Sequence, residues 1–177
     1  DMTLNVPDYR SVERTFQLIT QVAGRAGRAD FPGKVIVQTY EPDNYGIRLA
    51  ARQDYRAFYF EEERVRRRAL YPPFTVLARL LVSSKDGEKA KSTAEALEKQ
   101  LGALFEENPV LRRDVVQYRA LEAPIRLLRG EVRYMVFIKM YARGASDEIV
   151  SCMEEMEAQE FEEGVRVELE VNPASMM

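Results

Sequence analysis

The residues with the clearest chemical potential lie early in the chain, in the octet QVAGRAGR at positions 21–28. Arg25 and Arg28 are separated by about one helical turn, and Gly24 and Gly27 leave room for a close approach of backbone or ligand. Two guanidinium groups held in this way can bind phosphate oxygens and stabilise the charge that develops during phosphoryl transfer. The pattern also suits an ordinary helix C-terminus with a glycine cap and basic side chains near the dipole. The octet alone leaves both interpretations open.

A helix is predicted to carry the octet. It begins near Ser11 and ends between Gly24 and Gly27, because apolar residues recur on one face at Val12, Phe16, Ile19 and Ala23. The segment KVIVQTY at 34–40 follows, and its β-branched and aromatic residues predict a buried strand. Two further helices are expected at 44–52 and 54–69, the latter packing through Tyr55, Phe58, Tyr59, Val65 and Ala69. The YPPF sequence at 71–74 ends that helix and marks a domain boundary.

The second half of the chain predicts a β-α-β-β-α-β order. Alternating apolar residues indicate strands at 74–82, 115–121, 132–140 and 165–171, with a loop at 123–130. Helical stripes indicate one helix over 86–107 and another capped by Ser146. Four methionines in these elements, Met135, Met140, Met153 and Met156, are expected in the core. This order is typical of an α+β, ferredoxin-like (split βαβ) domain whose sheet carries two helices on one face.

Composition excludes several classes of protein. The chain of 177 residues has one cysteine, Cys152, and no histidine, so it holds no intrachain disulfide and no cysteine-based zinc site. It has no long apolar run and no signal-peptide pattern, so we expect a cytoplasmic protein without membrane contact. It begins with Asp1 rather than methionine and shows its motif at once, which predicts a piece of a larger protein.

Charge is distributed unevenly along the chain. Residues 112–143 contain 8 basic and 3 acidic side chains, whereas residues 144–177 contain 1 basic and 10 acidic ones. A local basic stretch of this kind indicates a local anionic partner. Within it, Arg126, Arg129 and Arg133 surround a glycine and are candidates for contacting phosphates or unpaired bases, with Tyr118 and Tyr134 as possible stacking platforms. Tyr134 shares a strand face with apolar residues and is more simply a core residue.

A second basic cluster is formed by Arg64, Arg66, Arg67 and Arg68 on the predicted helix 54–69. The favoured interpretation is a solvated face balanced by Glu61, Glu62 and Glu63 one turn earlier.

The flanks of the octet resemble a known family. LNVPDYRSVERTFQLIT before it and FPGKVIVQTYEPDNYGIRLAARQDYRAFYFEEERVRRRALYPPF after it are similar to the end of the helicase core of primosomal protein N-prime, the bacterial replication-restart DNA helicase of superfamily 2. The resemblance continues at lower specificity through PIRLLRGEVRYMVFIKM and VELEVNPASMM, and so covers essentially the whole chain.

This resemblance implies an organisation in three parts. Residues 1–42 would be the end of the second RecA-like helicase lobe, an α/β fragment; residues 43–72 a helical linker; and residues 73–177 the α+β C-terminal domain. The octet would be helicase motif VI, which faces nucleotide bound to the first lobe. Arg28 would be the catalytic arginine finger and Arg25 its partner, while Gln21, Gly24 and Gly27 would contribute to the nucleotide-binding surface.

The resemblance also implies cofactors and partners. The parent protein would use ATP and magnesium, and would carry zinc in a segment absent here; this chain lacks a phosphate loop and a Walker B pair, so no cofactor and no ATP hydrolysis are expected of it alone. The parent would bind branched DNA at stalled forks, other primosome proteins, and the acidic tail of single-stranded-DNA-binding protein, for which Arg143 is the candidate contact. The alternative is a free-standing module that binds nucleic acid or an acidic peptide without ATPase coupling.

Overall fold

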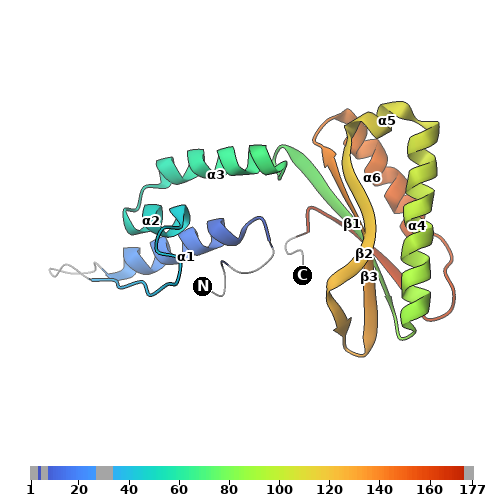
Figure 1. Ribbon diagram of the computed structural model, residues 1–177, viewed down its shortest axis with the longest axis horizontal. Coiled ribbons are helices and arrows are strands. Elements are labelled where there is room, and N and C mark those ends of the chain that lie inside the picture. Colours follow the sequence, from blue (N-terminus) through green and yellow to red (C-terminus); the bar gives the residue numbers. More distant parts are fainter. Residues whose placement is uncertain (1–3, 5–7, 27–33, 174–177) are drawn as a thin grey trace. The chain divides into compact units, whose positions relative to one another are not determined.

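The computed structural model describes residues 4, 8–26 and 34–173, and the chain divides into two compact units (Figure 1). The N-terminal unit comprises Asp1–Ala69 and the C-terminal unit Leu70–Met177. The assignment of residues 1–42 to a helicase lobe and 43–72 to a linker stays a prediction.

Three helices make up the regular structure described in the N-terminal unit: α1 (Ser11–Ala26), α2 (Tyr45–Ala51) and α3 (Tyr55–Ala69). The predicted end of the first helix is confirmed, since α1 ends at Ala26. The Asn44 side chain caps α2 by accepting a hydrogen bond from the Gly46 amide at 2.9 Å, and Asp54 accepts one from the Ala57 amide at 3.0 Å. These caps satisfy amide groups that the first helical turns leave unpaired.

A small aromatic core joins the three helices. The rings of Phe16 and Phe58 stack with their centroids 4.0 Å apart, and Leu49 and Ala50 of α2 complete the buried cluster. The predicted packing side of α3 is only partly right, because its buried residues are Phe58 and Glu62. The side chains of Tyr55, Tyr59 and Val65 are exposed instead.

The burial of Glu62 follows from an ion-pair network. Arg66 lies 2.7 Å from Glu62 and 2.7 Å from Glu13, so one guanidinium joins α3 to α1. The Tyr45 hydroxyl donates a hydrogen bond to Glu62, and burial together with this carboxylate raises the pKa of Tyr45. The other arginines of the cluster fit the solvated interpretation, since Arg64 and Arg67 pair with exposed or partly exposed glutamates on their own helix.

The strand predicted at 34–40 is wrong for the described residues. Residues 34–39 have no regular secondary structure, and Ile36 is 80% exposed. A strand is formed only by pairing its backbone with a neighbour, and residues 34–40 have no paired strand within the part of the unit that the structure describes. The composition of the segment indicated a strand, but composition does not supply the partner.

The C-terminal unit is built on four antiparallel strands in the spatial order β2-β3-β1-β4. Its elements along the chain are β1 (Thr75–Ser84), α4 (Gly87–Glu107), α5 (Pro109–Asp114), β2 (Val115–Leu128), β3 (Glu131–Tyr141), α6 (Gly144–Glu157) and β4 (Val165–Val171). Figure 1 shows α4 and α6 covering the same face of the sheet. The predicted α/β character and the order of strands and main helices are confirmed.

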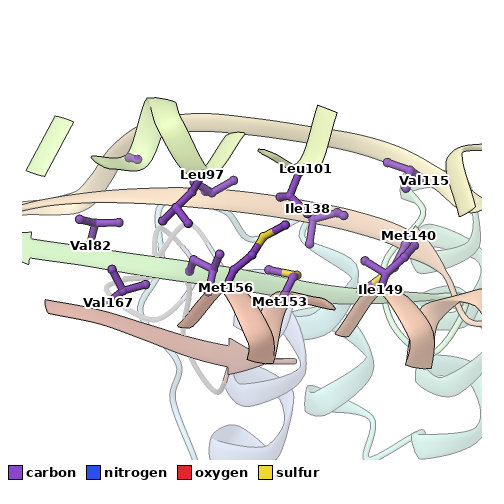
Figure 2. Packing of buried hydrophobic residues seen from close by; sticks show 14 of the residues in the cluster. Val82, Leu97, Leu101, Val115, Ile138, Met140, Ile149, Met153, Met156 and Val167 are labelled. Atoms are coloured by element: carbon purple, nitrogen blue, oxygen red, sulfur yellow. The ribbon is translucent and has the colours of Figure 1, made fainter. Parts of the chain in front are cut away.

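The main core lies between this sheet face and the two helices. Figure 2 shows Leu97 and Leu101 of α4 and Met153 of α6 directed toward Ile138 and the neighbouring strands. All four predicted core methionines are buried: Met140, Met153 and Met156 lie in this core, and Met135 lies in a separate small cluster with Leu81 and Ala123. Tyr134 packs against the edge of this core, as predicted.

Two local predictions are wrong, and one short helix was not predicted. β2 continues through most of the predicted loop to Leu128, with a register shift after Glu122, where Pro124 supplies no amide hydrogen to the ladder. A tight turn at Arg129 and Gly130, which have φ values of 52° and 82°, then leads into β3. The short helix α5 had no expected counterpart. Finally, α6 begins at Gly144, so Ser146 lies inside it, and its hydroxyl donates a 2.6 Å hydrogen bond to the Arg143 carbonyl.

We predict that Gly46→Ala destabilises the N-terminal unit by about 1–3 kcal/mol, because a Cβ at this position would lie 2.5 Å from Cγ1 of Val12. The matched control is Gly24→Ala, also inside a helix, whose Cβ would meet no atom within 4 Å among the described residues. That change should stabilise the helix by about 0.5–1 kcal/mol. Hydrogen exchange of the α1 and α2 amides measures both effects, and equal protection in the two variants would contradict this packing.

Candidate functional site

The described part of the octet lies on an exposed face of α1. Gln21, Gly24 and Arg25 are all exposed, and Gln21 and Arg25 are one turn apart on the same side of the helix. Arg25 makes no ion pair with any residue that the structure describes. Gly27 and Arg28 lie outside the described residues, so the predicted finger arginine has no position here.

Apolar side chains accompany these polar groups. Leu18 is 49% and Val22 55% exposed on the same helix. A shallow hollow of about 520 Å³ is lined by Arg14, Gln17, Leu18 and Gln21. The face therefore combines amide, guanidinium and aliphatic groups, which is the composition of a surface that contacts another protein surface.

Contacts at the start of α1 and on its buried side fix the position of the helix. Asp8, which is buried, accepts a hydrogen bond from the Arg10 amide at 2.9 Å, and its carboxylate lies 3.1 Å from Arg14. Farther along the helix, Glu13 pairs with Arg66 of α3. Phe16 packs in the aromatic core. These contacts hold α1 in place and leave Gln21 and Arg25 in solvent.

The four arginines predicted to bind nucleic acid or a partner do not form one cluster. Arg129 and Arg133 line the same pocket at the β2-β3 turn, on the face of the sheet opposite to the helices. Arg126 is exposed and lies 3.4 Å from Glu122 of its own strand. Arg143 precedes α6, lies 3.4 Å from the buried Asp114, and places its guanidinium over the Tyr141 ring.

The proposed stacking role of Tyr118 has no support in the structure. Its ring packs edge-on against Phe105 of α4, with centroids 5.1 Å apart, and is partly buried. Sequence reasoning missed the two other hydrogen-bond donors in the lining of the Arg129 and Arg133 pocket, namely the side chains of Ser83 and Arg166. The available signal was the alternation of β1 and β4, which places both residues on the sheet face away from the helices.

The described residues offer neither a metal site nor a membrane span, and the one cysteine is of low reactivity. Within residues 8–26 and 34–173, no group of three or more histidine, cysteine or carboxylate side chains is arranged to hold a metal ion. No helix in the described part of the chain is long and apolar enough to cross a membrane. Burial and nearby glutamates raise the pKa of the Cys152 thiol, which lowers its reactivity at neutral pH.

The chain is similar over its full length to known bacterial proteins. It is 38% identical over 178 residues to replication restart protein PriA of Bacillus subtilis (strain 168), in a match that covers 100% of this chain and 21% of that protein. It is 33% identical over 179 residues to replication restart protein PriA of Treponema pallidum (strain Nichols), covering 100% of this chain and 26% of that protein. A shorter match of 85 residues to the Chlamydia trachomatis protein of the same name is 49% identical and covers 48% of this chain and 11% of that protein.

These relatives confirm the resemblance predicted from the octet and its flanks, although no family model matches the chain. The chain spans about a fifth to a quarter of the length of the two relatives that match it throughout.

We predict that Arg66→Met loosens the support of α1 and costs about 3 kcal/mol, because it leaves the buried Glu62 carboxylate without its cation. Arg67→Met is the matched control, since Arg67 is exposed and its pair with Glu63 contributes about 0–1 kcal/mol. Urea unfolding measures the loss of stability in each variant, and hydrogen exchange of the α1 amides shows whether this helix has loosened. If both variants lose the same small amount, the network does not fix this helix.

Proposed function

We propose, for a chain that belongs to the replication restart protein PriA family, that it is the C-terminal part of an ATP-dependent DNA helicase that restarts replication at stalled or branched forks. The observation that carries the proposal is the exposed α1 face, where Gln21 and Arg25 stand in solvent beside Leu18 and Val22. A helicase motif that contacts nucleotide on another lobe requires this kind of open, partly apolar surface.

In this proposal five residues of the octet have a role. Arg28 acts as the arginine finger on the phosphate that is being transferred, and Arg25 contacts phosphate or the facing lobe. Gln21 couples the nucleotide state to the position of the lobes. Gly24 and Gly27 allow close approach, and Gly24 has open space where a side chain would stand. ATP and magnesium are bound by residues outside this chain, which has no phosphate loop, and zinc belongs to the parent only.

The exposed segment that follows the octet supports the assignment to a RecA-like lobe. Val35, Ile36 and Val37 form an apolar run with strand composition, yet they are exposed and unpaired with another strand in the described structure. We infer that these residues form a strand of the lobe when the remaining strands are present. The N-terminal unit would then be the end of a larger α/β layer.

The C-terminal unit is proposed to be a ferredoxin-like domain that recognises the DNA fork and partner proteins. Its β-α-β-β-α-β order, interrupted only by α5, and its strand order β2-β3-β1-β4 support this. Arg126, Arg129 and Arg133 are the proposed DNA contacts. Arg143, exposed before α6, is the proposed contact for the acidic tail of single-stranded-DNA-binding protein. Other primosome proteins are further proposed partners, and the site of action is the cytoplasm.

A second candidate is a binding module that acts without ATPase coupling. The observation in its favour is that the C-terminal unit has a complete hydrophobic core of its own, formed by α4, α6 and one sheet face. Such a unit can fold and bind nucleic acid or an acidic peptide by itself. The two candidates differ in whether the octet is needed for activity.

We predict that Arg28→Ala, made in the longer protein that contains a phosphate loop, lowers DNA-stimulated ATP hydrolysis by about 10³-fold or more. Arg25→Gln should lower it by a smaller factor, because Arg25 is assigned a supporting contact. The control is Arg68→Ala on α3, where the side chain is exposed and far along the sequence from the octet. Steady-state ATPase assays with single-stranded DNA measure the effect, and unchanged turnover in Arg28→Ala would favour the binding module.

A further inference from the structure

A polar row crosses three neighbouring strands on the sheet face opposite to α4 and α6. Ser83 of β1 lies directly opposite Arg133 of β3 on one side and Arg166 of β4 on the other. Val82 precedes Ser83 and points into the helix-covered core, so the row lies on the other side of the pleat. The row therefore places one guanidinium group on each side of the Ser83 hydroxyl.

Arg133 is the unusual member of this row. It is only 8% exposed, and its side chain makes no ion pair or hydrogen bond with any residue that the structure describes. The other arginine that is buried in the described structure, Arg79, lies 2.9 Å from Glu170 on the same sheet face. No side-chain nitrogen of Arg133 is among the described buried atoms that lack a partner, so the guanidinium reaches solvent through the pocket and is open to a partner from outside.

The surroundings of Arg133 form a site rather than a flat surface. A pocket of about 140 Å³ is lined by Arg133, Ser83, Arg166 and the turn residue Arg129. Arg129 is exposed and, like Arg133, makes no ion pair within the described structure. Arg166 is already balanced, at 3.0 Å from Glu131 and 3.2 Å from Glu168, which also belong to the lining. Three arginines and two glutamates leave the lining with one net positive charge, which matches a singly charged anion.

We propose that this pocket binds one backbone phosphate of a DNA strand, with Arg133 as the buried anchor, Ser83 as a hydroxyl donor and Arg129 at the rim. Arginine and serine side chains are the usual donors to phosphate oxygens, and a phosphodiester carries a single negative charge. An acidic peptide fits less well, because six of the eight lining residues are polar or charged and leave no slot for the apolar anchor that protein interfaces use.

This site deepens the proposed DNA-binding function and rests on it. It differs from the earlier sequence interpretation in adding Ser83 and Arg166, and in making Arg133 rather than the exposed Arg126 the central contact. It is also separate from the Arg143 surface, where the exposed guanidinium lies over the Tyr141 ring and 3.4 Å from Asp114.

The test uses the full 177-residue chain and a fluorescently labelled single-stranded oligonucleotide of mixed sequence. Arg133→Gln is expected to weaken binding about tenfold and to lower the slope of log affinity against log salt by about 0.7, the value for one phosphate contact on single-stranded DNA. The affinity of Arg133→Lys should fall between those of the wild type and Arg133→Gln, because lysine keeps the charge but loses the planar guanidinium that makes paired hydrogen bonds. Arg113→Gln, on α5 and 71% exposed at its side chain, is the matched control and should change little.

Two outcomes would overturn the proposed phosphate site. In the first, Arg133→Gln binds DNA with the affinity and salt slope of the Arg113→Gln control. In the second, the wild-type chain does not bind DNA. If Arg133→Gln melts at a lower temperature than the wild type, the arginine side-chain NMR signals of the wild-type chain decide instead. The Arg133 Nε–H signal should shift when DNA is added, and an unmoved signal refutes the proposal.

The two proposals fail separately. Loss of the Arg133 effect leaves the ATPase role of the octet intact, whereas unchanged ATPase in Arg28→Ala leaves the phosphate pocket standing.

Discussion

Burial of apolar side chains is the constraint on which the rest of this structure depends, and the two units meet it differently. In the C-terminal unit, α4 and α6 cover one face of a four-stranded sheet and bury a continuous core that includes Leu101, Ile138 and Met153. In the N-terminal unit the aromatic core around Phe16 is small, and Val22 and Ile36 remain in water. Apolar surface left in this way is the physical reason for treating the first unit as part of a larger lobe.

Charged groups in the two units also differ in whether they have a partner within the described structure. Glu62 is buried, but Arg66 and the Tyr45 hydroxyl satisfy it, and the result is a fixed geometry between α1 and α3. Arg133 is buried to a similar degree and has no counter-ion among the described residues. The first arrangement is closed and structural, whereas the Arg133 guanidinium is open to the pocket it lines and is available to a ligand. Exposure alone does not separate functional arginines from structural ones; the presence or absence of a partner does.

Sequence patterns predicted the C-terminal unit well because its periodicities arise from burial within the unit itself. The alternation that placed Val136, Ile138 and Met140 on one strand face holds in the structure. The errors occur where distant residues decide: Pro124 does not end β2, because the strand resumes pairing after the register shift, and residues 34–39 form no strand without a neighbour. For the candidate sites, the sequence brought Arg129 and Arg133 to one turn, but it could not show that Ser83 and Arg166, many residues away, meet them across the sheet.

The central claim is that the N-terminal unit is completed by residues outside this chain, and hydrogen exchange at the amides of Val35, Ile36 and Val37 tests it most directly. The same amides are compared in the 177-residue chain and in the longer protein. The account predicts fast exchange in the chain alone and strong protection in the longer protein, where the segment pairs as a strand. Equally fast exchange in both would show that these residues never join a sheet, and would contradict the assignment of the unit to a helicase lobe.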